Sequence, residues 1–379
     1  MRIGILTQPL YCNYGGIIQC YALQTVLKRM GHETIILQRE FDKHYTFKGV
    51  CLYYAKHLIK LLLGRQSSWH YFVDPQKRDY IAQNTYNFID KNIKPRSNHY
   101  YNSNELKQDV ARQNLDAIIV GSDQVWRPDY SPCLPNYFLD FLEEGCKTKR
   151  IAYAASFGSD TWTYSNIQTQ ICGSLLKKFN AVSVRELSAI ELCKKHFGVD
   201  AIQTLDPTML LEQDDYLNII DRKERKRGEL FCYVLDRSQE KKHIIAHIEK
   251  ATHLKPFESM PGLKENNYNL YGDIDKCVYP PLEDWISAFY EANMVVTDSF
   301  HGTIFSIIFN KPFWVIGNER RGMTRFLSLL SLFNLEDRLI TTASLNTLNI
   351  YKTIDWKSVN EHRKKQQKES MDFLQRVLN

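Results

Sequence analysis

The residues best suited to chemistry lie in the stretch NMVVTDSFHGTIFSIIFNKPFWVIG, which runs from Asn293 to Gly317. Met294–Thr297 has the composition of a buried strand, and Thr303–Phe309 supplies about two apolar helical turns. His301 lies in the polar loop Asp298–Gly302 that we expect between them. There, unpaired N–H groups and the helix dipole favour an anion. An imidazole that exchanges protons near neutral pH would stand beside an anion pocket.

Neighbours of His301 are predicted to complete this anion site. Gly302 would let a ligand approach the backbone closely, because glycine carries no side chain. Ser299 and Phe300 share the loop and are predicted to bind the same ligand. Cationic side chains that could contact the negative charge lie downstream, at Lys311, Arg320 and Arg321.

Arg185 is the second chemical candidate, because it directly follows the apolar segment Ala181–Val184. If that segment is a buried strand, a permanent cation stands at the edge of the sheet. A guanidinium can bind a phosphate or carboxylate through two parallel hydrogen bonds. The alternative is a structural ion pair with Glu186 or another acid.

Two other polar loops are predicted to bind a sugar. The loop Gln8–Gly16 follows the first strand, and Asn13, Tyr14, Gly15 and Gly16 could line a cleft from that side, although turn formation explains the asparagine and the glycines nearly as well. Cys12 has no feature of a nucleophile, so a structural role is expected. The second loop follows Ala117–Val120 and holds Ser122, Asp123 and Gln124, which resemble a contact with sugar hydroxyls, with loop capping as the alternative.

Strands and helices alternate along most of the 379 residues, which predicts an α/β fold with parallel sheets. We expect two Rossmann-like domains that face each other across a cleft, as in GT-B enzymes. Residues 1–215 would form the acceptor side, and residues 216–379 the donor side, with a closing helix over residues 355–378. Residues 42–113 are expected to be mostly helical.

Composition narrows the classes of partner and the compartment. The formal net charge of +6 suits an anionic small molecule or an anionic membrane surface and is too weak for nucleic acid. Nine cysteines without a C-x-x-C pair predict free thiols rather than a zinc site, and we expect neither a metal nor a cofactor. We see no signal peptide and no apolar run of ~18 residues, so a cytoplasmic protein is expected. The segment Val50–Gly64 could lie on the inner face of the membrane, or be an ordinary core helix.

Six segments together carry a family resemblance: NYGGIIQCYALQ, IIVGSDQVW, YAASFG, SVRE, DPTMLL and VVTDSFHGTIFSIIFNKPF. In this order they resemble the polysaccharide pyruvyl transferase family, over about Arg2 to Trp314. The resemblance implies transfer of pyruvate from phosphoenolpyruvate to a sugar as a cyclic ketal, in the synthesis of a surface or capsular polysaccharide. It assigns the donor site to Arg185 and His301. Some members carry an arginine where this chain has Ser299, so another cation is expected to contact the donor phosphate.

Two other classes of function stay open from the residues. A GT-B glycosyltransferase that uses a nucleotide sugar could have the same fold, although the second half shows no clear signature for a nucleobase and ribose. A non-catalytic protein that binds anions or glycans is the further alternative. By analogy with the family, the expected acceptor is a saccharide on a lipid carrier.

Overall fold

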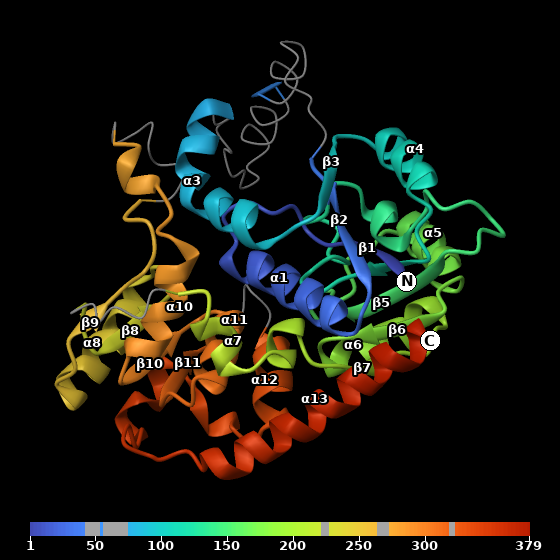
Figure 1. Cartoon of the computed structure of the whole chain (residues 1–379). Helices are drawn as coiled ribbons and strands as arrows, with labels where there is room; N and C mark the ends of the chain where they lie inside the picture. Colours follow the sequence, from blue (N-terminus) through green and yellow to red (C-terminus); the bar gives the residue numbers. More distant parts are fainter. Residues whose placement is uncertain (42–53, 56–74, 221–226, 264–272, 318–322) are drawn as a thin grey trace.

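The computed structural model describes residues 1–41, 54–55, 75–220, 227–263, 273–317 and 323–379. Within these residues the chain forms two parallel β-sheets, each packed between helices (Figure 1). The first sheet is built from the amino-terminal half and the second from the carboxyl-terminal half. The predicted α/β class with two Rossmann-like halves is confirmed. The expected domain boundary at residue 215 stays a prediction, between strands that end at Gln203 and begin at Leu230.

The first sheet has seven described strands in the order β3-β2-β1-β4-β5-β6-β7, and every neighbouring pair is parallel. This is the doubly wound order, in which the strand sequence reverses between β1 and β4. The strands are β1 (Arg2–Leu6), β2 (Glu33–Arg39), β3 (Arg96–Tyr100), β4 (Ala117–Val120), β5 (Lys149–Ala155), β6 (Ala181–Val184) and β7 (Ile202–Gln203). The helices of this half are α1 (Tyr14–Arg29), α3 (Pro75–Asn92), α4 (Ser103–Gln113), α5 (Asn166–Leu176), α6 (Leu187–Leu192) and α7 (Gln213–Leu217).

The second sheet has five described strands in the order β12-β11-β10-β8-β9, again all parallel. Its order reverses between β8 and β10. The strands are β8 (Leu230–Tyr233), β9 (Pro256–Phe257), β10 (Met294–Thr297), β11 (Phe313–Ile316) and β12 (Leu339–Ile340). The helices are α8 (Gln239–Thr252), α10 (Leu282–Glu291), α11 (Phe300–Ile308), α12 (Met323–Leu332) and α13 (Trp356–Leu378).

Apolar packing joins the two halves. One cluster of buried residues runs from Ile17 on α1 through Trp285 on α10 to Phe305 on α11, and separate clusters cover the far face of each sheet. Tyr14, on the first turn of α1, packs against Trp285 with ring centroids 5.6 Å apart and donates a hydrogen bond to the Pro280 carbonyl at 2.6 Å. The halves therefore meet in one continuous core rather than across a hydrated gap.

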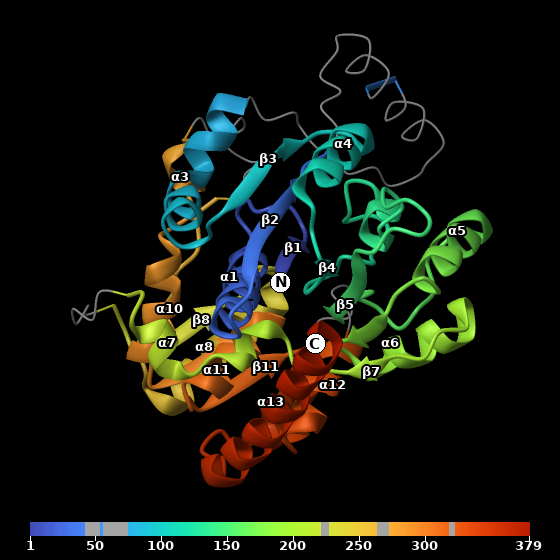
Figure 2. The ribbon, with the colours of Figure 1, turned by 45° about the vertical axis from the view of Figure 1, so that its right-hand side comes forward.

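The closing helix α13 begins beside the second half and ends on the first (Figures 1 and 2). Ser370 accepts a hydrogen bond from the Leu205 backbone at 3.0 Å, and Phe373 packs against Tyr153 of β5. Near its end, the Val377 carbonyl accepts a hydrogen bond from Lys149 at 3.1 Å. The last helix thus ties the two halves together.

Three local expectations need correction. Both α1 and α11 begin three residues earlier than predicted, so Gly15 and His301 lie in the first turn of a helix rather than in a loop. Residues 42–113 also contain a strand, β3, whose sequence RSNHY is too polar to read as a strand because it pairs on one side only, at the edge of the sheet. The segment Val50–Gly64 lies, apart from residues 54–55, outside the described residues. No helix among the described residues is both long and apolar enough to cross a membrane.

Candidate active site

The principal cavity lies where the carboxyl edges of the two sheets face each other, and its volume is about 660 Å³. Its walls come from the segments after β1 and β4 in the first half and after β8 and β10 in the second. These are the two points at which strand order reverses, and ligands of open α/β sheets bind at such points. The cavity is therefore the candidate active site.

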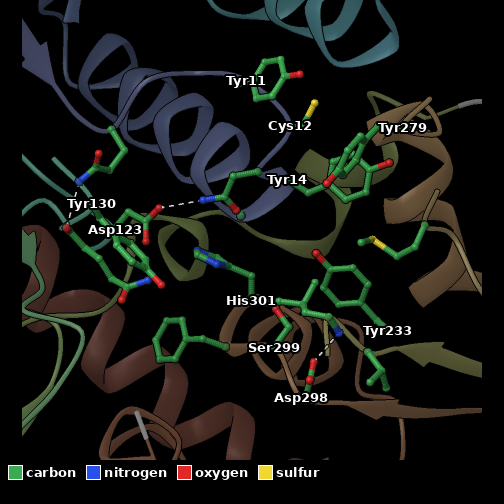
Figure 3. A pocket seen from close by; sticks show the side chains of 18 of the residues that line it. Tyr11, Cys12, Tyr14, Asp123, Tyr130, Tyr233, Tyr279, Asp298, Ser299 and His301 are labelled. Atoms are coloured by element: carbon green, nitrogen blue, oxygen red, sulfur yellow. Dashed lines mark hydrogen bonds between the residues drawn. The ribbon is translucent and has the colours of Figure 1, made fainter. Parts of the chain in front are cut away.

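His301 projects from the first turn of α11 toward the residues of the first half (Figure 3). Ser299 precedes the helix as its N-cap and accepts a hydrogen bond from the Gly302 N–H at 3.3 Å. A Cβ atom on Gly15 would lie only 2.1 Å from Nδ1 of His301. Because Gly15 has no side chain, the imidazole can lie directly against the start of α1.

Asp206 of the first half faces the same imidazole. Its Oδ2 lies 3.6 Å from Nε2 of His301 and 3.0 Å from Nη1 of Arg185. Its Oδ1 accepts hydrogen bonds from the backbone and hydroxyl of Thr208, and Ser122 donates to Oδ2 at 3.0 Å. Burial alone would raise the pKa of Asp206, but the adjacent His301 and Arg185 hold it well below its usual range. The carboxylate is therefore fixed in its charged form beside the imidazole.

Arg185 lies beneath this cluster and does not line the cavity. Its side chain is 2% exposed and is surrounded by Asp206, Glu186 at 3.8 Å and Asp123 at 3.9 Å. Burial opposes its charge, but these carboxylates raise the pKa of Arg185 overall. Its guanidinium also stacks on the Phe300 ring at 4.3 Å. The interpretation as a direct phosphate clamp is corrected by this burial, and the alternative of an ion-paired arginine describes the observed contacts.

Other predicted donor contacts divide into two groups. Ser299 and Phe300 line the cavity. Gly302 does not line it, because its N–H is bonded to Ser299 and a Cβ there would lie 2.2 Å from the Thr297 hydroxyl oxygen. Its lack of a side chain serves packing instead of ligand approach.

The prediction for Lys311 is wrong. Lys311 follows the far end of α11 and does not line the cavity. A helix of nine residues spans about 13 Å, which removes Lys311 from the carboxyl edge of the sheet. Its ammonium donates to the Tyr290 carbonyl at 2.7 Å instead. Arg320 and Arg321 lie outside the described residues.

The predicted acceptor contacts also divide. The residues that line the cavity are Asn13, Tyr14, Gly15, Asp123 and Gln124. Asn13 donates to Oδ2 of Asp123 at 3.1 Å, a contact visible in Figure 3. Gly16 lies behind it, where a Cβ would come within 2.9 Å of the Asn13 side chain, and Ser122 is fully buried. These two residues support the wall rather than form it, so their prediction as ligand contacts is corrected. Cys12 is buried with a free thiol.

Several functional residues were not predicted. Asp206 follows a strand as Arg185 does, so the rule that site residues gather at carboxyl ends could have found it. An aromatic wall from both halves includes Tyr11, Tyr233 and Tyr279 (Figure 3), and no local pattern marks these tyrosines. Within the described residues, no group of three or more His, Cys, Asp or Glu side chains could hold a metal ion. That no metal or cofactor is needed stays a prediction.

A family model for polysaccharide pyruvyl transferase matches residues 13–320. The chain belongs to the polysaccharide pyruvyl transferase family. The match contains the segments that supply His301, Asp206 and Gly15 to the cavity, so the described site falls inside the region that defines the family. This member is accordingly a transferase that acts in the modification of polysaccharide. A search of curated protein sequences finds no significant match.

Solved structures with a similar fold include the glycosyltransferase UGT89C1 of Arabidopsis thaliana complexed with UDP, at 10% identity and a TM-score of 0.50, with 100% of each chain covered. Another is the N-terminal domain of trehalose-6-phosphate phosphatase from Candida albicans, at 10% identity and a TM-score of 0.50, with 100% of this chain and 96% of that chain covered. At such identities the likeness concerns the fold alone. It supports the GT-B-like arrangement of this pyruvyl transferase family member.

Proposed function

We propose that the protein transfers the pyruvyl group of phosphoenolpyruvate to two hydroxyls of a saccharide, forming a cyclic ketal. The observation that carries the proposal is His301, a cavity-lining imidazole at the start of α11 that faces the buried carboxylate of Asp206. The family assignment supports the reaction type, and a cavity of about 660 Å³ is in the range of small-molecule sites.

The reaction needs a proton donor and an anion site. Protonation of the methylene carbon of phosphoenolpyruvate makes the central carbon electrophilic, and a sugar hydroxyl adds to that carbon and loses its proton. Phosphate then leaves with the C–O bonding pair, and a second hydroxyl of the same sugar adds and loses a proton. The net products are the ketal and inorganic phosphate, so no oxidant or reductant is required.

His301 would deliver the proton to the methylene carbon. Nε2 faces Asp206, while Nδ1 faces the space left by the missing side chain of Gly15. A carboxylate opposite one ring nitrogen stabilises the imidazolium and orients the other nitrogen, as in other acid–base pairs. Arg185 would act indirectly, because it holds Asp206 in position.

The saccharide would lie on the side of the first half. Asn13, Asp123 and Gln124 present an amide, a carboxylate and a second amide along the cavity, which suit hydrogen bonds to sugar hydroxyls. We further propose that the saccharide is carried by a lipid and that the protein meets it at the inner face of the membrane. Liposomes that bear such a carrier should retain the protein, and failure to bind them would remove this last element.

Mass spectrometry of candidate saccharides incubated with the protein and phosphoenolpyruvate tests the proposal. We expect a pyruvyl ketal and one phosphate released per ketal. His301→Gln, which keeps the side-chain volume, should reduce the rate by about 10²–10⁴-fold with an unchanged circular dichroism spectrum. A folded variant with the wild-type rate would remove His301 from the chemistry. Transfer from a nucleotide sugar instead of phosphoenolpyruvate would identify a glycosyltransferase.

A further inference from the structure

The cavity has an unequal distribution of positive charge. Besides His301, the cations that line it among the described residues are Arg78, Arg237 and Arg325. Arg237 is bound to Glu258 at 2.6 Å and to the carbonyls of Pro261 and Gly262. The guanidinium of Arg78 lies over the Tyr11 ring at 4.3 Å. These two arginines are engaged at the wall opposite Asp123.

Arg325 differs because it is buried, at 6% exposure, while it still lines the cavity. It projects from the first turn of α12, next to the cavity-lining Phe326. Burial, followed by repulsion from Arg185, lowers the pKa of Arg325 to about 10, with Glu186 and Asp123 opposing this shift. Arg325 therefore stays charged at neutral pH in surroundings that disfavour its charge, and a bound anion would relieve this cost.

The elements around Arg325 also favour an anion. Both α11 and α12 begin at the cavity, and neither has an acidic residue in its first turn. The amino ends of helices carry partial positive charge and N–H groups that attract anions. Independently, Nε2 of His301 has no hydrogen-bond partner among the described residues, although the residue is only 7% exposed. A buried polar atom without such a partner is unusual and is satisfied when a ligand binds.

We infer that Arg325 and the first turns of α11 and α12 form an oxyanion subsite that holds the phosphate or carboxylate of the donor beside His301. The inference rests on the proposed function for the identity of the donor. It gives the donor a cation that lines the cavity, which Arg185 cannot provide from beneath Phe300. A guanidinium is suited to either oxyanion because its fork binds two oxygens.

Isothermal titration of the full chain with phosphoenolpyruvate, inorganic phosphate and pyruvate tests the subsite. Arg325→Gln should weaken binding of phosphoenolpyruvate about 10–100-fold, the range expected for loss of a charge-assisted hydrogen bond. Arg325→Lys should weaken it about 3–10-fold, because lysine keeps the charge but loses the fork. Loss confined to phosphate assigns the phosphate to Arg325, and loss confined to pyruvate assigns the carboxylate.

Arg338→Gln is the matched control. Arg338 is also a buried arginine of the second half, at 2% exposure, but it lies over Trp314 at 4.9 Å and does not line the cavity. Its substitution should lower stability and leave the dissociation constants unchanged.

The outcomes separate the inference from the proposed function. If the wild type binds phosphoenolpyruvate and Arg325→Gln binds it equally well, the subsite is overturned while the proposed function stands. If Arg325→Gln fails to fold, Arg325→Lys decides, and a wild-type dissociation constant in that variant overturns the subsite. If the wild type binds phosphate through Arg325 but not phosphoenolpyruvate, the subsite stands and the proposed donor is wrong. Binding of none of the three ligands overturns both.

Discussion

Each half of the molecule places one buried aspartate at the carboxyl edge of its sheet, and the two aspartates have different partners. Asp298, after β10, accepts from Lys241 at 2.5 Å and from the backbone N–H groups of Leu235 and Asp236 at 2.6 and 3.1 Å. All of these partners belong to the second half. Asp206 binds Arg185, Ser122 and Thr208 of the first half and also faces His301 of the second.

The comparison shows how a buried carboxylate can serve two purposes. Asp298 holds the segments after β8 and β10 in register within one half, so its role is to support the local backbone. Asp206 is also supported within its own half, and it presents a charge to the residue across the cavity. A buried ion pair is weak evidence for stability on its own. A contact between the halves at the edge of a cavity is the more informative observation.

The largest expected effect on stability comes from Asp298→Asn. The substitution leaves the Lys241 ammonium buried, with a side chain 9% exposed, opposite a neutral amide. Loss of one partner of a buried pair costs about 3–5 kcal/mol. We expect a loss of this size in the free energy of unfolding, measured by urea denaturation followed by circular dichroism.

The double variant Asp298→Asn, Lys241→Met is the control for that measurement. Because it removes the unpaired charge, it should recover part of the lost stability. A double variant that is less stable than Asp298→Asn alone would show that Lys241 contributes chiefly through other contacts.

Gly15→Ala should sharpen the contrast from the side of Asp206. The added Cβ would lie 2.1 Å from Nδ1 of His301, so the imidazole must move away from its position opposite Asp206. A displacement of about 1 Å in an active site can cost about 10²-fold in rate. We expect a loss of that order in ketal formation with little change in melting temperature.

Gly145→Ala is the matched glycine substitution. Gly145 has φ +76, and among the described residues no heavy atom lies within 4 Å of the place that a Cβ would take, so alanine there meets backbone strain alone. It should cost about 1 kcal/mol in stability and leave the rate unchanged. Equal rates for the two glycine variants would contradict the proposed role of the close approach at Gly15.

The smallest effect is the pH dependence of Asp206→Asn. Because His301 and Arg185 outweigh burial and depress the pKa of Asp206, its contribution to stability is present above the ordinary pKa of about 4. It is lost as the pH falls through the lowered folded-state pKa. The stability difference between wild type and Asp206→Asn should therefore narrow by on the order of 1 kcal/mol between pH 5 and about pH 2. A constant difference over this range would contradict the depressed pKa.

The strands that carry the site could be predicted because each is a short apolar run followed by polar residues. This pattern is enough to place His301 and Asp123 at the carboxyl edges of their sheets. It fails for β3, whose polar residues pair at the margin of the sheet. It also fails at helix starts, since Gly15 and the polar residues around His301 resemble a loop in sequence.

Side-chain partners could not be predicted in the same way. Arg185 and Lys311 are candidates because of their charge, but burial among carboxylates and the length of α11 remove both from the cavity wall. Arg325 is not a candidate from the sequence because an arginine in an amphipathic helix normally faces solvent. Its orientation toward the cavity depends on how the two sheets face each other, and no local pattern encodes that arrangement.

The path of α13 has a consequence for biosynthesis. Helix α13 binds Lys149, Leu205 and Tyr153 of the first half after the chain has completed the second. The first half would therefore leave the ribosome with its docking surface for α13 still bare, and His301 would meet Asp206 in a stable arrangement only after residues 356–378 had been translated. Newly made chains should thus acquire activity abruptly and late, rather than in proportion to their length.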